Sequence, residues 1–251
     1  MQTKETVIEI KNLKKSFGNL TVLNNISLQL HKEENLVILG KSGSGKSVLI
    51  KCIVQLLQPD EGTISVFGNE ANADIYEIRK KIGFLFQSGA LYDSMTVKQN
   101  LEFPLRRLKK ELSDSEIDAK VLEALENVGL EDVLNQMPSQ LSGGMKKRIS
   151  LARTIIIDPE IILYDEPTTG LDPVTADEIS TLINDIQKKF KTASIIITHD
   201  IECVRTVADR IIMIKDGEVY KEGTLAEFEV ETDKFISSFF KTKKKQYHGT
   251  K

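Results

Sequence analysis

Residues Gly40-Lys41-Ser42-Gly43-Ser44-Gly45-Lys46-Ser47 match the pattern G-x-x-x-x-G-K-[ST]. In this pattern the glycines let backbone N–H groups close around phosphate oxygens, the lysine reaches the β- and γ-phosphates, and the serine hydroxyl faces Mg²⁺. The loop lies between an apolar run, Leu36 to Leu39, and a helix-like stretch, Val48 to Leu57, which is the strand–loop–helix context that the pattern requires. The helix N-terminus adds positive charge. We therefore expect the loop and Val48 to bind a nucleoside triphosphate.

The overall composition narrows the class of protein. The chain has 251 residues, 40% of them hydrophobic, which suits one large domain or one domain with an inserted subdomain. Its net charge of −3 argues against nucleic acid as a main partner. Cys52 and Cys203 lie far apart in apolar, helix-like segments, so we expect buried, reduced thiols. No apolar stretch approaches the roughly 18 residues of a membrane span, and Met1 to Glu5 lack signal-peptide character, so membrane association is expected through a partner.

Apolar alternation predicts a β-rich first third. We expect strands at Val7 to Leu13, Ile26 to Leu30, Leu36 to Leu39, Thr63 to Phe67 and Ile82 to Phe86, a turn at Pro59 to Gly62 and a short helix at Tyr76 to Lys81.

Helix signals dominate between Ser88 and Gln140. A helix is expected from Val97 to Phe103, ending before Pro104. The capping box Ser113 to Glu116 opens a second helix that runs to Val128 and stops at Gly129. This stretch predicts an inserted helical subdomain.

The α/β alternation then returns and predicts a mainly parallel sheet. The expected elements are strands at Ile161 to Tyr164, Ser194 to Thr198 and Arg210 to Ile214, a hairpin turn at Asp216-Gly217 into Glu218 to Lys221, and a helix capped by Thr224 to Glu227.

Two carboxylates, Asp165 and Glu166, stand at the end of the Ile161 strand, where open α/β sheets place their ligands. Asp165 is expected to hold Mg²⁺ through water, and Glu166 to orient or deprotonate an attacking water. Acidic residues in this position are more often helix caps when they occur alone. The phosphate loop upstream favours the catalytic interpretation.

The segment Leu141 to Met145 precedes a helix expected from Lys146 to Ile157 and offers Ser142, Gly143 and Gly144 at its N-terminus. This is a second anion-binding device, although it could be a simple helix cap. Because one nucleotide does not need two phosphate cradles, we expect this one to serve a nucleotide held by another copy of the chain.

Together these motifs resemble those of ATP-binding subunits of ABC transporters. The resemblance rests on Gly40 to Ser47, Gln87 after Phe86, Leu141 to Met145, Ile161 to Glu166, Gly170-Leu171-Asp172, and His199 after a strand. It implies an α/β fold of the P-loop NTPase, ABC ATPase type, with a mainly parallel core sheet, an N-terminal antiparallel β-subdomain and an inserted α-helical subdomain. The ATPase domain is expected at residues 5–228, the helical subdomain at about 88–157, and a C-terminal extension with a basic tail at 229–251.

The resemblance also implies roles for single residues in an ATPase that uses Mg²⁺ and forms a homodimer. Phe17 resembles the aromatic that stacks on adenine, where tyrosine is more usual, with a plain core phenylalanine as the alternative. Gln87 resembles the residue that senses Mg²⁺ and the γ-phosphate, and His199 the one that contacts the γ-phosphate. The expected catalytic set is Lys46, Gln87, Glu166 and His199; the expected metal set is Ser47, Gln87 and Asp165; and Ser142, Gly143 and Gly144 are expected to close over ATP on the opposite subunit.

Two positions depart from the family pattern. Met145 stands where glutamine ends the usual signature, and Lys41 stands where proline often occurs in the phosphate loop. Neither change removes a group expected to contact phosphate, so we expect catalysis to survive.

Met145, read with Phe86 to Val97 and Phe103 to Arg106, resembles the ATPase of Mla-type, mammalian-cell-entry (MCE) lipid transport systems. That resemblance implies a membrane permease and an MCE-domain lipid-binding protein as partners, phospholipid as cargo, and a peripheral location at the cytoplasmic face of the inner (plasma) membrane. An importer ATPase for amino acids or other small solutes is the alternative within the family. A soluble ABC ATPase of DNA repair or translation is disfavoured, because those usually carry a long coiled-coil insertion or two cassettes.

Two further segments carry expectations about the membrane. The stretch from Gln87 to Arg107 presents Leu91, Tyr92, Met95 and Phe103, which suit a groove for a short permease helix unless they pack the helical subdomain's own core. The tail Lys241 to Lys251 has five lysines and no acid; we expect a solubilising terminus rather than an anionic-lipid contact.

Overall fold

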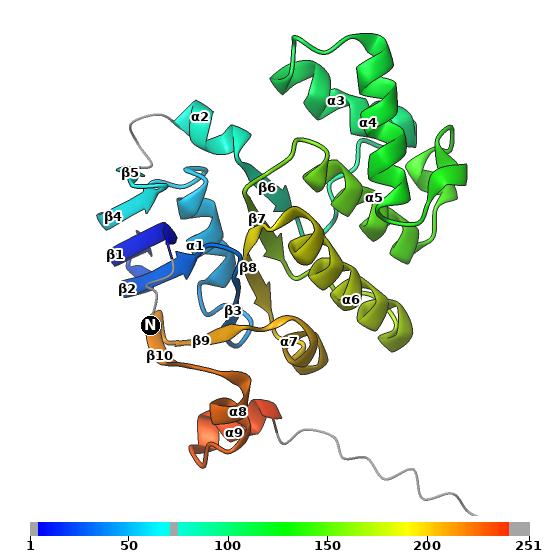
Figure 1. The fold of residues 1–251 in the computed structure, drawn as a ribbon. Helices are drawn as coiled ribbons and strands as arrows, with labels where there is room; N and C mark the ends of the chain where they lie inside the picture. Colours follow the sequence, from blue (N-terminus) through cyan, green and yellow to red (C-terminus); the bar gives the residue numbers. More distant parts are fainter. Residues whose placement is uncertain (1–4, 71–74, 241–251) are drawn as a thin grey trace, which may run out of the picture.

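Strand β3 (Asn35–Leu39), which precedes the phosphate loop, lies inside a six-stranded sheet of order β10-β9-β3-β8-β7-β6 (Figure 1). The structure, a computed structural model, describes residues 5–70 and 75–240. The other strands of the sheet are β6 (Ile82–Leu85), β7 (Ile161–Asp165), β8 (Ala193–Thr198), β9 (Arg210–Lys215) and β10 (Glu218–Gly223). The neighbours from β9 to β6 pair in parallel, and β10 pairs with β9 antiparallel. This confirms the predicted fold class.

A second, antiparallel sheet has the order β2-β1-β4-β5. Its strands are β1 (Thr6–Phe17), β2 (Leu20–His31), β4 (Glu61–Val66) and β5 (Asn69–Glu70). β4 begins inside the predicted turn Pro59 to Gly62: Gly62 has φ +88°, and a Cβ there would lie 2.5 Å from the Asn12 carbonyl oxygen. Only glycine lets β4 approach β1 so closely. β5 was not predicted, because two residues show no alternation.

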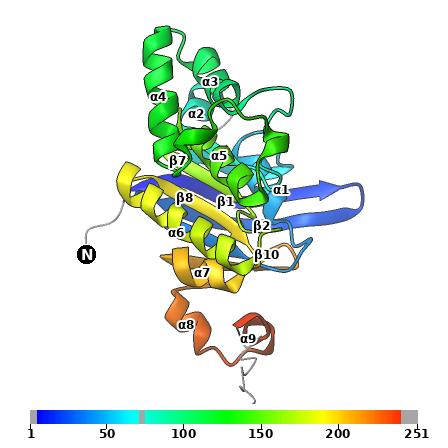
Figure 2. The ribbon, with the colours of Figure 1, turned by 90° about the vertical axis from the view of Figure 1, so that its right-hand side faces the viewer.

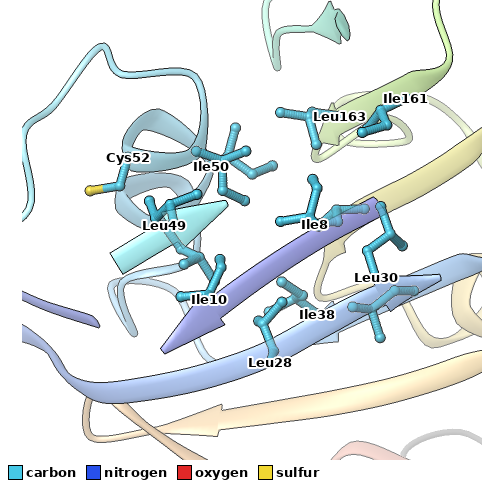
Figure 3. Close-up of a cluster of buried hydrophobic side chains, with 14 of the residues drawn as sticks. Ile8, Ile10, Leu28, Leu30, Ile38, Leu49, Ile50, Cys52, Ile161 and Leu163 are labelled. Atoms are coloured by element: carbon cyan, nitrogen blue, oxygen red, sulfur yellow. The ribbon is translucent and has the colours of Figure 1, made fainter. Parts of the chain in front are cut away.

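The main hydrophobic core fills the space between the two sheets (Figure 3). Ile8 and Ile10 of β1 face the helix that follows the phosphate loop, and Ile38 of β3 faces the same core. The residues on either side of Ile38, Val37 and Leu39, belong to a separate cluster on the opposite face of the sheet, with residues of α5 (Gly143–Ile155), α6 (Pro173–Phe190) and α7 (Ile201–Val207). Because both faces of β3 are covered, all its residues are buried.

Helix α1 (Lys46–Ile53) starts and ends earlier than the predicted Val48 to Leu57. It stops because Gln55 adopts a left-handed φ of +54°, one residue after the C-cap Val54. Cys52 is buried on this helix and Cys203 on α7 (Ile201–Val207), both as free thiols, as expected.

The helical stretch contains α3 (Val97–Leu108), α4 (Asp114–Glu126), short 3₁₀ turns at Glu131–Val133 and Pro138–Gln140, and α5 (Gly143–Ile155). The capping box at Ser113 is present, as predicted, and α4 ends at Glu126, two residues before the predicted Val128; Gly129 takes φ +65° beyond it. These helices share a hydrophobic cluster of their own, and α5 also contributes Leu151 and Ile155 to the cluster against the sheet. The boundaries 88–157 of an inserted subdomain remain our proposal.

The prediction that the first of these helices ends before Pro104 was wrong. α3 continues through Pro104 to Leu108. A proline inside a helix removes one backbone hydrogen bond and costs about 3 kcal/mol. Leu101 and Leu105 on either side of it are fully buried. Their burial stabilises the continued helix and offsets that cost.

The four apolar side chains of the Gln87 to Arg107 stretch divide between the two alternatives, a surface groove and the core of the helical stretch. Leu91 is half-buried and packs against the cluster of the helical stretch, and Met95 is also half-buried. Tyr92 and Phe103 are exposed, with their ring centroids 5.0 Å apart.

The last third of the chain supplies α6 (Pro173–Phe190), α7, α8 (Leu225–Glu229) and α9 (Lys234–Phe240). α8 and α9 lie at the end of the molecule opposite α3 and α4 (Figures 1 and 2). The capping box at Thr224 is present, as predicted. The basic tail, residues 241–251, lies outside the described residues. Within the described residues, no helix combines the length and apolarity needed to cross a membrane.

Candidate functional site

A cavity of about 600 Å³ opens beside the phosphate loop at the carboxyl ends of the parallel strands. Its lining brings together Lys41, Ser42, Gly43, Gly45, Lys46, Ser47 and Val48 with Gln87, Glu166 and His199, and adds Val22 and Phe239. Segments separated by more than a hundred residues in the sequence therefore meet around one space, as the motifs predicted.

The glycines of the loop are required by backbone conformation or by close packing. Gly43 and Gly45 have φ of +79° and +96°, a region that glycine enters without strain. A Cβ on Gly45 would lie 2.7 Å from the Val22 carbonyl oxygen, and one on Gly40 would lie 2.7 Å from that of Ile214. The loop is thus pressed between the two sheets, which holds its backbone in place.

Lys46 is buried at the centre of the loop. Its Nζ donates hydrogen bonds to the carbonyl oxygens of Gly40 at 2.7 Å and Lys41 at 2.9 Å. Burial lowers the pKa of the Lys46 ammonium, and the nearby Glu166 and Asp165 oppose that shift. The buried Ser44 hydroxyl has no hydrogen-bond partner within the described residues. A buried cation and an unpaired hydroxyl in one loop fit the phosphate oxygens of a nucleotide.

Ser47 and Asp165 form a polar pair next to the loop. The Ser47 hydroxyl donates to Asp165 Oδ1 at 2.9 Å. Burial raises the pKa of the Asp165 carboxyl, Glu166 raises it further, and the Ser47 hydrogen bond opposes the change. The described residues contain no group of three or more His, Cys, Asp and Glu side chains that could hold a metal. The Ser47 hydroxyl and the Asp165 carboxylate are oxygen ligands of the kind that Mg²⁺ prefers, so this pair fits a Mg²⁺ ion that would take its other oxygens from phosphates and water.

Glu166 is held by the ends of neighbouring strands. Its backbone has a left-handed φ of +51°, and its N–H donates to the Ile197 carbonyl oxygen at 2.9 Å. His199 Nδ1 lies 2.8 Å from Glu166 Oε2, and the Thr169 hydroxyl donates to the same oxygen at 3.1 Å. The Glu166 side chain is 13% exposed and that of His199 is 60% exposed. A carboxylate oriented by two partners at the cavity wall suits a proton acceptor.

The Leu141 to Met145 segment does not reach this cavity. Ser142 caps α5 by accepting a hydrogen bond from the Met145 N–H at 3.2 Å. Gly144 lies against the start of α6, where a Cβ would approach Thr175 Cγ2 to 2.6 Å. Ser142 and Gly143 are exposed. This placement leaves the segment open for contact with another molecule.

Phe17 is 46% exposed at the end of β1, so the alternative of a buried core phenylalanine was wrong. The Lys15 ammonium lies 5.6 Å from its ring centroid. Phe17 is not among the residues that line the cavity. Its adenine-stacking role remains a proposal.

The sequence interpretation missed a contribution from the C-terminal helices. Phe239 of α9 lines the cavity, and the Lys41 ammonium lies 5.3 Å from the Phe235 ring centroid. Thr169, which holds Glu166, was also missed. Nothing local in residues 234–240 indicates a return to the phosphate loop, because the contact depends on the tertiary fold.

This fold and site define an ATP-hydrolysing enzyme of the P-loop class. The family model described as ABC transporter matches residues 23–169, and the chain belongs to that family. It is 39% identical over 241 residues to the intermembrane phospholipid transport system ATP-binding protein MlaF of Haemophilus influenzae, covering 94% of this chain and 91% of that protein.

Other relatives have different transport assignments. The chain is 43% identical over 211 residues to the probable ribonucleotide transport ATP-binding protein mkl of Mycobacterium leprae, covering 82% of this chain and 60% of that protein. Among solved structures, a dimeric ATP-binding cassette in a post-hydrolysis state bound to ADP and Pi is 35% identical. It aligns with a TM-score of 0.79, covering 87% of this chain and 98% of that one.

Proposed function

We propose that this ABC ATPase powers a membrane lipid transporter of the Mla/MCE type, with phospholipid or a related lipid as cargo. The similarity to MlaF extends over 94% of the chain, and this observation carries the proposal. The partners are a membrane permease and an MCE-domain lipid-binding protein. The permease holds the ATPase at the cytoplasmic face of the inner (plasma) membrane.

The residues that line the cavity have separate roles in the proposed ATP hydrolysis. Lys46 turns its ammonium from the carbonyls of Gly40 and Lys41 to the β- and γ-phosphates. Glu166 accepts the proton of the attacking water, and His199 keeps that carboxylate in position. Ser47, Asp165 and Gln87 would hold a Mg²⁺ ion, which would neutralise phosphate charge.

The second half of each site comes from another copy of the chain in a head-to-tail homodimer. Ser142, Gly143 and Gly144 lie outside the cavity at an exposed helix N-terminus, where backbone N–H groups can meet the partner's γ-phosphate. Mixing Lys46→Ala and Ser142→Arg subunits tests this. One site of the mixed dimer pairs two intact halves, so the mixture should regain part of the activity that each mutant homodimer lacks. If mixed dimers form and regain nothing, the shared-site model is wrong.

The permease is proposed to dock near the exposed pair Tyr92 and Phe103. Arg153 supports this pair, with its guanidinium carbon 5.7 Å from the Tyr92 ring centroid. An aromatic pair with this exposure suits the apolar face of a short permease helix. Tyr92→Glu should lower co-purification with the permease and leave ATP binding by the isolated chain unchanged. Glu substitution at Tyr76, another exposed tyrosine, on α2 (Ile75–Lys80), is the control.

An importer ATPase for a small solute is the second candidate, because the mycobacterial relative mkl is described as a probable ribonucleotide transport protein. Purifying the membrane complex and identifying its subunits and bound small molecules by mass spectrometry separates the two. A co-purified MCE-domain protein with phospholipid supports the lipid proposal. A solute-binding protein in its place would refute it.

A further inference from the structure

Helix α5 carries a buried lysine, Lys147, which does not line the cavity beside the phosphate loop. Lys147 lies five residues after Ser142 and is 6% exposed. Burial lowers the pKa of its ammonium, and Asp165 and Glu166 oppose that shift. Burying an ammonium is costly unless it forms a hydrogen bond, so such a residue calls for a structural or functional reason.

The hydrogen bond of Lys147 leads to the site. Its Nζ donates to the backbone carbonyl oxygen of Gln87 at 2.8 Å. Gln87 itself lines the cavity with Lys46 and Glu166. A side chain of the helix that begins at Ser142 is therefore fastened to the backbone of the residue that faces the nucleotide.

Two more contacts fasten α5 to the segment that follows Gln87. Arg153 donates to the carbonyl oxygens of Ala90 at 2.8 Å and Gly89 at 3.2 Å. A Cβ on Gly89 would lie 2.5 Å from the Ser150 hydroxyl oxygen, so helix and segment pack without a gap. Positions 147, 150 and 153 are three residues apart and share one face of the helix.

We propose that Lys147 is a positioning residue, which sets the place of Gln87 at the nucleotide through the Gln87 carbonyl. A movement of α5, and with it of Ser142 at its start, then moves Gln87 by the same hydrogen bond. The inference rests on the proposed role of Gln87 in hydrolysis. The inference adds Lys147 as the residue that fixes the position of Gln87 relative to Ser142, the residue proposed to meet the partner subunit.

The decisive variants keep the helix and change only the donor. Lys147→Met removes the ammonium while keeping an unbranched side chain of similar length. The substitution leaves the Gln87 carbonyl oxygen without this donor, at a cost in stability, so the melting temperature of each variant is measured to establish that it is folded at the assay temperature. Lys147→Arg keeps a donor and should retain most of the activity. Lys146→Met, on the exposed neighbouring side chain, is the control.

The measurement is MgATP hydrolysis by the full chain in its membrane complex, with ATP affinity measured separately. Lys147→Met should lower kcat roughly tenfold to a hundredfold, as expected for a displaced reacting group, and leave ATP affinity unchanged. In a Gln87→Ala background the same substitution should have no further effect, because both act through one residue.

Three outcomes would overturn the inference. If Gln87→Ala is impaired and Lys147→Met has normal kcat, Lys147 does not position Gln87, and the proposed function stands. If Lys147→Met lowers kcat equally with and without Gln87, its effect does not pass through Gln87. If Gln87→Ala hydrolyses ATP normally, the proposed role of Gln87 is wrong and the inference falls with it.

Discussion

Replacing Glu166 by glutamine is the sharpest test of the chemistry proposed for the cavity. In the native protein, His199 Nδ1 and the Thr169 hydroxyl lie 2.8 Å and 3.1 Å from Glu166 Oε2. Glutamine has the shape of glutamate and keeps one oxygen that can accept hydrogen bonds from both partners. The substitution leaves Lys46, Ser47 and Asp165 unchanged. It removes the ability to accept a proton from water. Glu166→Gln should therefore bind ATP normally and hydrolyse it slowly.

The expected loss follows from the contribution of a positioned general base, about 10²- to 10⁴-fold in rate. At 1.36 kcal/mol per factor of ten, this corresponds to about 2.7 to 5.4 kcal/mol of activation free energy. Phosphate release by the full complex measures kcat, and equilibrium binding of ATP to the same preparation measures affinity. ATP-bound dimers should accumulate.

The control is Glu160→Gln, which changes a carboxylate just before the same strand. Glu160 is 54% exposed and pairs with Lys81 at 2.9 Å, outside the cavity. This variant should hydrolyse ATP at the normal rate. Ordinary turnover by Glu166→Gln would refute Glu166 as the proton acceptor, and a large loss of ATP affinity would mean that the side chain holds the loop rather than the water.

Two further predictions concern stability and thiol chemistry. The Glu34 carboxylate is buried and accepts hydrogen bonds from Arg210 at 2.7 and 2.9 Å. Burial acts to raise its pKa, but the hydrogen bonds from Arg210 and from the His31 N–H outweigh burial and lower the pKa. The ionised Glu34 therefore stabilises the fold above pH 4.5, and this stabilisation is lost as the pH falls through the lowered pKa. In urea titrations, Glu34→Gln should lower the free energy of unfolding by about 1.5 to 3 kcal/mol at pH 7 and should make that free energy fall less steeply with acid. Burial raises the pKa of Cys52 to about 11 and that of Cys203 to about 12, so iodoacetamide at pH 8 should label both thiols in urea and neither in the native protein; rapid native labelling would contradict their burial.

Local patterns in the sequence were sufficient to locate the site but not all of its walls. The phosphate loop, Glu166 after β7 and His199 after β8 line one cavity, because parallel strands bring their carboxyl ends to one edge. Phe239 could not be found this way. Its place depends on how α8 and α9 fold back, and a short amphipathic segment such as Lys234–Phe240 does not specify which surface it covers.

The errors in the predicted helix boundaries also arise from packing and capping contacts that local patterns do not show. A proline usually ends a helix, and the local rule predicted an end before Pro104. The burial of Leu101 and Leu105 overrides that rule, and such packing is visible only in three dimensions. Ser142 begins α5 before the predicted Lys146 because its side chain caps a first turn made of two glycines, which helix propensity alone disfavours.

The order of strands in the central sheet has a consequence for how the chain is made. β3 pairs with β8 and β9, which begin at Ala193 and Arg210, while the loop that follows β3 presses against Ile214. On the ribosome, the phosphate loop therefore leaves the exit tunnel long before either neighbour of its strand has been synthesised. Until then the apolar β3 has two open edges, which is the condition under which nascent chains aggregate or bind chaperones. Nucleotide can stabilise the fold only after almost the whole domain has emerged.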